Sequence, residues 1–201
     1  MQNEKLKKLL LKELEKSKVV KVDYNNKKIK YSDKISLERS IAKIGGDEEL
    51  VRAYLVHKLS GLNYKSENII IEREYSAGRP KTTTPRIDLI LKENLETSFY
   101  FIEVKDPDKW ESDKLFIEGQ LFNLSKLEKS DVKYLVYYTV QEVNGKIQDK
   151  TIVIDRAKYD TYQKWTEDGQ PSISNDLSPA YGKPIKIPYV KLGEKDLNSS
   201  L

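Results

Sequence analysis

The stretch "PRIDLILKENLETSFYFIEVK", residues 85–105, decides the fold of this chain. It holds two runs of mainly β-branched, aliphatic and aromatic residues, 86–93 and 99–105, joined by the short segment "NLETS". Connections this short join antiparallel neighbours, so we expect a pair of antiparallel strands. Both runs also contain charges: Asp88 in the first, Glu103 and Lys105 in the second. A buried charge is unfavourable unless a partner compensates it, so these three residues are candidates for a functional site.

The segments on either side of this pair predict a mixed sheet flanked by helices. Strands are expected from "NIIIEREYS" before it, and from "VKYLVYYTV" and "GKIQDKTIVID" after it. Helices are expected from "GGDEELVRAYLVHKLSGLNY", with Asp47 as N-cap, from residues 112–130, and from the short segment 157–169. A helix, three strands, a helix and a strand in this order indicate an α/β fold, with the strand at 132–140 reached by a helical crossover.

The two ends of the chain differ from this central part. Near the N-terminus, Leu6, Leu9, Leu10 and Leu14 recur at helical spacing, and "VVKVDYNNKKIKYS" predicts a hairpin with an Asn-Asn turn. Residues 1–34 contain eleven lysines and five acidic residues, a balance that permits contact with nucleic acid without establishing it. We therefore predict an N-terminal basic helix and hairpin appendage at 1–40, a core at 41–165, and an extended tail or linker at 166–201.

Composition excludes several kinds of site. The 201 residues include no cysteine and one histidine, so disulfides, thiolate-bound zinc and iron–sulfur clusters are excluded, and His57 is expected to be structural. A metal here would be a hard cation held by carboxylates. Neither a membrane span nor a signal peptide is expected, which favours a cytoplasmic protein. The segment "GRPKTTTP" lacks the glycine and lysine order of a phosphate-binding loop, so no ATP site is expected.

The charges inside the strands have two interpretations. Glu103 and Lys105 are two residues apart and point to one face, and pairing of the strands can bring Asp88 beside them. Two adjacent carboxylates repel unless a cation or a proton lies between them. A Mg²⁺ ion bound by Asp88, Glu103 and the Val104 carbonyl would suit them, with Lys105 orienting or deprotonating a water. The alternative is an ordinary ion-pair cluster on a half-exposed hairpin.

Several motifs resemble one nuclease superfamily. Pro85 and Asp88, followed by Glu103-Val104-Lys105, are similar to the spaced core motif of the PD-(D/E)XK nucleases. The helix "DEELVRAYLVHKL" resembles the Pro-Glu-Glu-x-Val-Arg start found in the N-terminal nuclease domain of type I restriction enzyme R (motor) subunits, with Asp47 in place of proline. "GQLFNL" is similar to the Gln-x-x-x-Tyr motif of RecB-like nucleases, although Leu124 replaces the tyrosine. The resemblance spans roughly residues 45–197.

The resemblance implies a restriction-endonuclease-like nuclease core and a role for each matching residue. Asp88 and Glu103 would bind Mg²⁺, with Mn²⁺ as a substitute, and Lys105 would assist the nucleophilic water. Gln120 would support the site or contact the scissile region. A glutamate of the first core helix usually completes such a site. Glu48 is preferred because it shares a helical face with the apolar residues that point to the sheet, whereas Glu49 is expected on the opposite side. The alternative is that Glu48 and its neighbour Glu49 serve only the helix dipole.

Function and partners follow from the same resemblance. We expect a Mg²⁺-dependent endonuclease acting on double-stranded DNA, with Arg79, Lys81 and Arg86 as candidate phosphate contacts. No helicase motif occurs in these residues, so a motor would be encoded beyond Leu201 or on another chain, and target choice would come from methylation and specificity subunits. Two alternatives stay open: a RecB-like repair or recombination nuclease, and a non-catalytic module for DNA or protein binding on the same fold.

Overall fold

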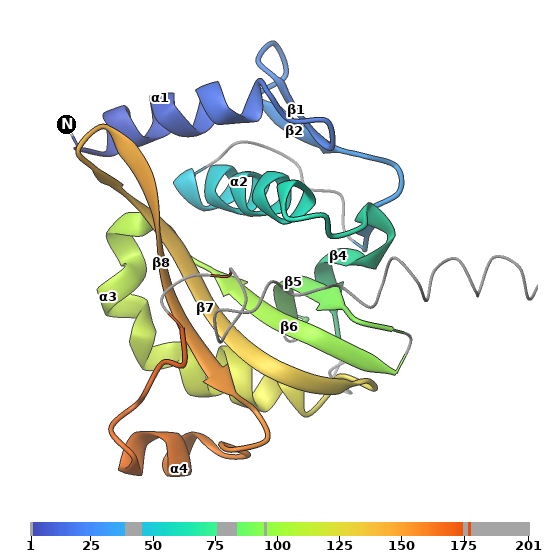
Figure 1. Cartoon of the computed structure of the whole chain (residues 1–201), viewed down its shortest axis with the longest axis vertical. Helices are drawn as coiled ribbons and strands as arrows, with labels where there is room; N and C mark the ends of the chain where they lie inside the picture. Colours follow the sequence, from blue (N-terminus) through green and yellow to red (C-terminus); the bar gives the residue numbers. More distant parts are fainter. Residues whose placement is uncertain (1, 39–45, 76–83, 95, 175–176, 178–201) are drawn as a thin grey trace, which may run out of the picture.

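The computed structural model describes residues 2–38, 46–75, 84–94, 96–174 and 177. In it, a six-stranded sheet and a separate two-stranded hairpin are flanked by helices (Figure 1). The α-helices are α1 (Gln2–Leu14), α2 (Asp47–Gly61), α3 (Trp110–Asp113) and α4 (Tyr162–Glu167). The strands are β1 (Val20–Asp23), β2 (Lys28–Tyr31), β3 (Ser36–Leu37), β4 (Ile69–Glu74), β5 (Arg86–Lys92), β6 (Thr97–Val104), β7 (Asp131–Val143) and β8 (Lys146–Asp155). The predicted α/β class with a mixed, helix-flanked sheet is confirmed.

Strand order in the sheet is β3-β4-β5-β6-β7-β8. β3 pairs parallel with β4, and β6 pairs parallel with β7, while the other neighbours are antiparallel. The expected β5–β6 antiparallel pair and the helical crossover to β7 are therefore both present. That crossover contains the 3₁₀ turns η2 (Pro107–Lys109) and η3 (Lys114–Phe116), helix α3 between them, and the π-helical turn η4 (Glu118–Asn123).

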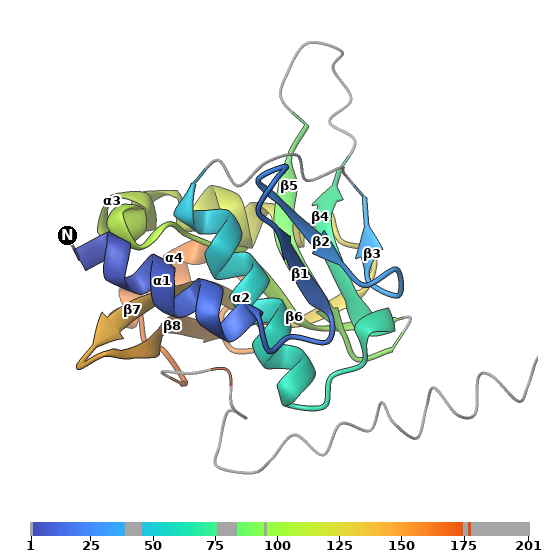
Figure 2. The same cartoon turned by 90° about the horizontal axis from the view of Figure 1, so that it is seen from above.

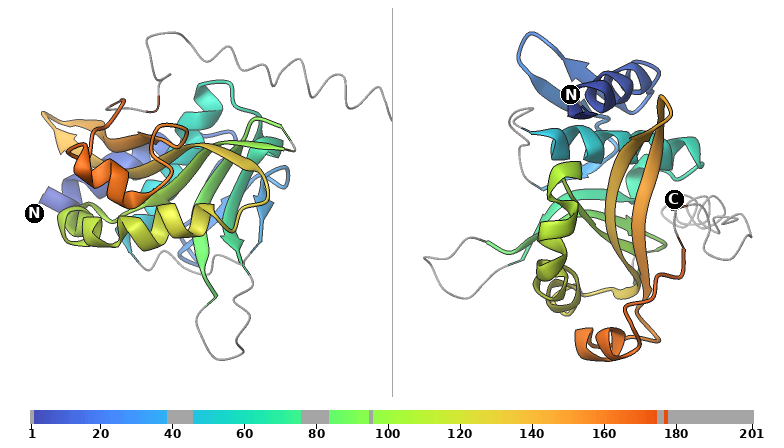
Figure 3. Two further views of the ribbon diagram at one scale, coloured as in Figure 1. Left: turned by 90° about the horizontal axis from the view of Figure 1, so that it is seen from below. Right: turned by 90° about the vertical axis from the view of Figure 1, so that its left-hand side faces the viewer.

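Alternation along the strands divides the core into two clusters. One aligned row runs across the sheet and lies in the same cluster as the apolar side of α2: Ile71, Leu89, Ile102, Val136 and Val153. The neighbouring row packs on the other side with Trp110, Phe122 and Trp165 of the crossover and α4: Ile70, Ile90, Phe101, Leu135 and Ile154. Helices thus cover both faces (Figure 3), as a two-residue side-chain period in apolar strands requires.

The N-terminal segment packs against the core. Leu6, Leu10 and Leu14 of α1 and Ile29 of β2 are buried in the α2 cluster, and α1 and the hairpin lie over α2 (Figure 2). The predicted appendage and core therefore share one hydrophobic cluster, although the predicted boundaries at 40 and 165 stay predictions. Most of the predicted tail lies outside the described residues.

Helix α2 begins one residue earlier than a cap at Asp47 implies. Gly46 is the N-cap, with extended backbone, and Asp47 is the first helical residue. The prediction of Asp47 as cap was wrong because an acidic residue suits the positive first turn as well as the cap itself. Asp47, Glu48 and Glu49 all lie in that turn.

Among the described residues, no helix combines the length and apolar character needed to cross a membrane.

Candidate active site

The sheet divides between β5 and β6 at the position of the predicted acidic residues. The β5–β6 ladder has Leu89 opposite Ile102 as its last pair at this end. Beyond it β5 continues only beside β4, through Ile87 opposite Arg73, while β6 continues only beside β7, through Glu103 opposite Tyr137. Asp88 and Glu103 stand where the two strands separate. Side chains rather than backbone bonds therefore fill the opening between them.

Asp88 joins the two separating strands. Its Oδ2 accepts a hydrogen bond from the backbone N–H of Val104 at 2.8 Å, where a ladder bond from the neighbouring strand is missing. Its Oδ1 accepts from Nη1 of Arg52 on α2 at 2.9 Å. Asp88 is only 5% exposed, and both oxygens are satisfied, which meets the requirement for a buried carboxylate.

Arg52 is the cation that the sequence analysis did not identify. Its guanidinium also forms ion pairs with Glu49 of the same helix and with Glu72 of β4, both buried. Burial would lower the pKa of Arg52, but Asp88, Glu49 and the other acidic neighbours outweigh burial and raise the pKa above its ordinary value. Three buried carboxylates thus converge on one guanidinium. The hydroxyl of Tyr31 on β2 donates to Glu49 Oε1 at 3.0 Å, which ties the hairpin into the same network.

Glu103 and Lys105 form a buried pair on the other side of the opening. Lys105 Nζ lies 2.7 Å from Glu103 Oε1. Burial first, and then the charge of Asp88, raise the pKa of Glu103 well above its usual range. Burial would lower the pKa of Lys105, but Glu103, Asp88 and Glu48 together raise it, so its ammonium form is favoured. Two hydrogen bonds fix the backbone of Lys105: its N–H donates to the Tyr138 carbonyl, and the Thr139 hydroxyl donates to the Lys105 carbonyl.

Glu48 approaches the same group of charges from the first turn of α2. Burial and the neighbouring Asp88 raise its pKa, while Lys105 and Arg52 act in the opposite direction. Glu48 is therefore an electrostatic neighbour of the expected site, as the sequence analysis expected. Glu49 is the more buried of the two, at 6% exposure, and faces Arg52. The expectation that Glu49 lies on the opposite side was wrong, because its ion pair with Arg52 holds it in the buried network. Its role is accordingly an ion pair within the network, not a surface contribution to the helix dipole alone.

A row of three carboxylates crosses the sheet here. Ile71, Leu89 and Ile102 are aligned, and the next residue of each strand is acidic: Glu72, Asp88 and Glu103. Glu72 has φ of 56°, in the left-handed region that non-glycine residues rarely adopt, and the β4–β5 ladder skips it. Such backbone costs on the order of 1–3 kcal/mol and persists only where its surroundings hold it, often at functional sites.

Arg86 lies at the Glu72 end of this row. Its Nε lies 2.8 Å from Glu72 Oε2, and its side chain is 43% exposed. It is therefore held by the network and still reaches solvent, as a phosphate contact requires. The other two predicted DNA contacts, Arg79 and Lys81, lie outside the described residues.

Gln120 lies on the π-helical turn η4, which packs against β5, β6 and β7. Its side-chain oxygen is buried and has no hydrogen-bond partner within the described part of the chain. An unsatisfied buried acceptor is unfavourable, and π-helical turns are frequent at functional sites. The structure thus gives Gln120 a free acceptor but no direct bond to Asp88, Glu103 or Lys105.

Oxygen donors fit a hard divalent cation better than any other metal class. Asp88, Glu103, Glu48 and the Val104 carbonyl supply such donors on both sides of the opening, and the charge of Asp88 contributes to the raised pKa of Glu103. Within the described residues, however, no three acidic or histidine side chains form a ready-made metal cluster. Arg52 and Lys105 neutralise the carboxylates instead. The donors fit Mg²⁺ or Mn²⁺ provided that these ion pairs rearrange.

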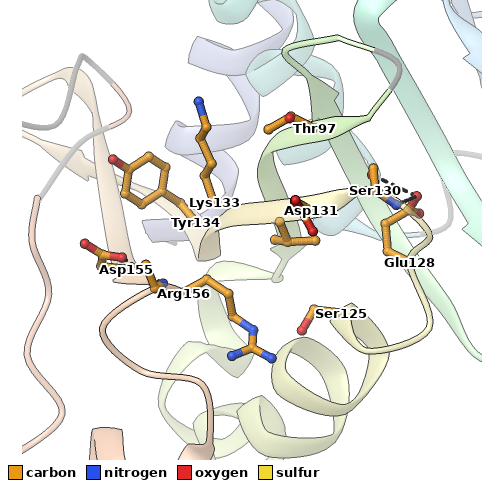
Figure 4. A pocket seen from close by; sticks show the side chains of 11 residues that line it. Thr97, Ser125, Glu128, Ser130, Asp131, Lys133, Tyr134, Asp155 and Arg156 are labelled. Atoms are coloured by element: carbon orange, nitrogen blue, oxygen red, sulfur yellow. Dashed lines mark hydrogen bonds between the residues drawn. The ribbon is translucent and has the colours of Figure 1, made fainter.

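A separate hollow of about 680 Å³ lies at the opposite end of β6 and β7. Its lining includes Thr97, Ser125, Lys133, Asp155 and Arg156, and Arg156 and Ser125 point toward each other across it (Figure 4). This hollow is widely open and mixed in charge, and it contains none of the acidic residues of the strand opening. It is therefore distinct from the candidate active site.

No protein-family model matches this chain, and a search of curated proteins finds no match either.

Proposed function

We propose that this chain is a metal-dependent endonuclease domain of the PD-(D/E)XK type that hydrolyses phosphodiester bonds of double-stranded DNA. One observation carries the proposal: Asp88, Glu103 and Lys105 converge at the point where β5 and β6 separate, with Glu48 of α2 as a fourth neighbour. Side chains rather than ladder hydrogen bonds fill the gap at the paired carboxylates, so a phosphate would enter by rearranging side chains and not the backbone of the sheet.

The proposed roles follow from the chemistry of each group. Asp88, Glu103, Glu48 and the Val104 carbonyl would hold Mg²⁺, which when bound supplies positive charge opposite the phosphate. Lys105 is protonated beside Glu103, so it can donate a hydrogen bond to a phosphate oxygen or to the attacking water. To remove a proton from that water, Lys105 must first lose its own, and this becomes easier once Glu103 is neutralised.

The wider setting is part of the proposal. The helix start "DEELVR" supports the nuclease region of a type I restriction R subunit, acting in the cytoplasm with a motor region and with methylation and specificity subunits. A RecB-like enzyme would instead act at DNA ends. Cleavage of covalently closed circular DNA separates the two, because an enzyme that needs an end leaves such circles intact.

A second function is favoured by a specific observation. Arg52 pairs with Asp88, Glu49 and Glu72, Arg86 pairs with Glu72, and Lys105 pairs with Glu103, so each carboxylate of the row has a cationic partner without metal. A non-catalytic DNA- or protein-binding module would keep this arrangement permanently. Metal binding therefore decides between the two functions.

The test is calorimetric titration of Mg²⁺ and of Mn²⁺ into the wild-type chain, Asp88→Ala and Glu103→Ala. Glu118→Ala serves as the matched control, since Glu118 is exposed on η4. The nuclease proposal expects binding to wild type and control and loss in the other two. Binding that survives both site substitutions, or no binding at millimolar concentration, would favour the non-catalytic module.

A further inference from the structure

The outward face of the β1–β2 hairpin is strongly basic. Six lysines and two aspartates occur between residues 18 and 34. A groove of about 600 Å³ runs along the hairpin, and four of these lysines line it: Lys18, Lys21, Lys28 and Lys30. All four are exposed.

The strand register places one like-charge pair and one opposite-charge pair on the outward face, since Asp23 lies opposite Lys28. Lys21 is paired with Lys30 across the two strands, because Val20 opposite Tyr31 and Val22 opposite Ile29 turn their side chains to the other face. Like charges in this position destabilise a sheet. An anion between them would remove the repulsion.

Most of this charge is uncompensated. Asp23 forms an ion pair with Lys30 at 3.0 Å. For Lys18, Lys21 and Lys28, the described part of the chain provides no ion pair. Three free ammonium groups on one small face attract a polyanion over a longer range than a single ion pair would.

The shape of the face favours a phosphate backbone. Lys28 and Lys30 are two residues apart on one strand, so their Cα atoms lie about 6.6–6.8 Å from each other. Their flexible four-carbon stems let each ammonium reach a different phosphate.

Tyr24, 57% exposed, does not line the groove, and Leu37, 43% exposed, is the large apolar side chain most exposed within it. Val19, Ile29 and Tyr31 also line the groove but are buried or half-buried, whereas its four lysines are exposed. A peptide partner would need more exposed apolar anchors than this surface offers.

The hairpin is also fixed relative to the candidate active site. Tyr31, on the inner face, donates to Glu49, which pairs with Arg52, which in turn pairs with Asp88. The turn of the hairpin and the Arg86 end of β5 project to the same side of the molecule in two perpendicular views (Figures 2 and 3). A duplex resting on the hairpin would therefore have a defined position relative to the opening between β5 and β6.

From these contacts we infer that the outer face of the β1–β2 hairpin binds the phosphate backbone of duplex DNA through Lys18, Lys21 and Lys28, outside the catalytic opening. The inference rests on the proposed function in its choice of duplex DNA as ligand. It adds a binding surface that none of the nuclease motifs contains.

The experiment measures binding of a fluorescein-labelled duplex over a series of NaCl concentrations, with EDTA present so that no cleavage occurs. The proteins are wild type, Lys18→Gln/Lys21→Gln/Lys28→Gln, and a control with the same loss of charge, Lys126→Gln/Lys129→Gln/Lys146→Gln, whose lysines are exposed elsewhere. Each phosphate contact contributes about 0.9 to the slope of log K against log[salt]. The hairpin variant should lower the magnitude of that slope by roughly 2–3, and the control should leave it unchanged.

Each other outcome overturns the inference. Wild type could fail to bind the duplex, or the hairpin variant could have the same salt slope as wild type. The control variant could lower the slope as much as the hairpin variant does, or poly-glutamate could bind through the hairpin as tightly as the duplex. Thermal unfolding verifies the fold, and substitution of Lys21 should leave stability equal or higher because it removes the repulsion with Lys30. Because EDTA removes metal, this result is independent of the metal titration. A hairpin slope change without metal binding would retain the DNA surface and reject the nuclease.

Discussion

Nη1 of Arg52 lies 2.9 Å from Oδ1 of Asp88, and the same guanidinium pairs with Glu49 and Glu72. The helix that carries Glu48 is thereby fastened to the strand that carries the first acidic residue of the candidate site. Any divalent cation that uses both oxygens of Asp88 must displace this contact. Arg52 therefore connects stability of the fold with occupancy of the site.

Substitution of Arg52 by Ala should destabilise the metal-free protein strongly. It leaves buried Asp88 and Glu49 without their cation and Glu72 with Arg86 alone. Loss of one partner of a buried ion pair costs about 3–5 kcal/mol. Added Mn²⁺ should restore part of the loss and raise the melting temperature of the variant more than that of wild type. Calorimetric melting with and without metal measures both effects. Arg52→Lys is the control that keeps the charge. A loss below about 1 kcal/mol in Arg52→Ala would contradict the network.

Substitution of Lys105 by Met should separate metal binding from cleavage. The variant retains Asp88, Glu103 and Glu48, so Mn²⁺ should still bind, and removal of the neighbouring ammonium should favour the cation further. A positioned proton donor or acceptor contributes about 10²–10⁴-fold to rate, and cleavage of closed circular DNA should fall by that factor. Lys146→Met, on an exposed part of β8, is the control. Undiminished cleavage would remove Lys105 from the mechanism.

Glu128 should make stability depend on pH in the acid range. Burial would raise its pKa, but the Tyr75 hydroxyl at 2.8 Å, Lys92 and Ser130 outweigh burial and lower it. A carboxyl with a lowered pKa in the folded state stabilises fully above its unfolded value, about 4.3, and loses that contribution as pH falls through the folded value. Glu128→Gln should therefore unfold with a weaker dependence on pH below about 4.3. Urea unfolding at a series of pH values measures this, and an unchanged dependence would exclude Glu128 as its source.

Substitution of Leu10 by Ala should destabilise the whole chain. Leu10 is 1% exposed in the cluster that α1 shares with α2, and truncation of a buried leucine costs about 2–5 kcal/mol. Leu9→Ala, at a half-buried position of the same helix, should cost clearly less. Urea unfolding followed by circular dichroism should show one transition, shifted to lower denaturant in Leu10→Ala. A separate early transition for residues 1–40 would show that this segment is an independent appendage.

The sheet was predictable because its signal is local. The β5 and β6 runs are short, apolar and joined by five residues, and alternation of Ile87, Leu89 and Leu91 with their neighbours fixes two buried faces. The same period placed Glu103 and Lys105 together. Residue spacing on α2 correctly brought Glu48 toward them.

Contacts between distant segments were not predictable in this way. Arg52 was read only as part of a helix start, although a lone arginine between apolar residues on the buried side of a helix was a usable signal. Glu72 resembled an ordinary polar residue near the end of a strand. Neither its left-handed backbone nor its contact with Arg52 is contained in a local pattern.

The parting of β5 from β6 has a mechanical consequence. Asp88 and Glu72 lie on the β4–β5 half of the sheet, and Glu103 and Lys105 lie on the β6–β7 half. The distance between the Asp88 and Glu103 carboxylates therefore depends on the twist between the two halves of the sheet. The two halves are joined by the β5–β6 ladder, which contains a bulge between Leu91 and Lys92. Bulges increase local twist. Residues at this bulge can thus alter the spacing of the two carboxylates without contacting a bound ligand.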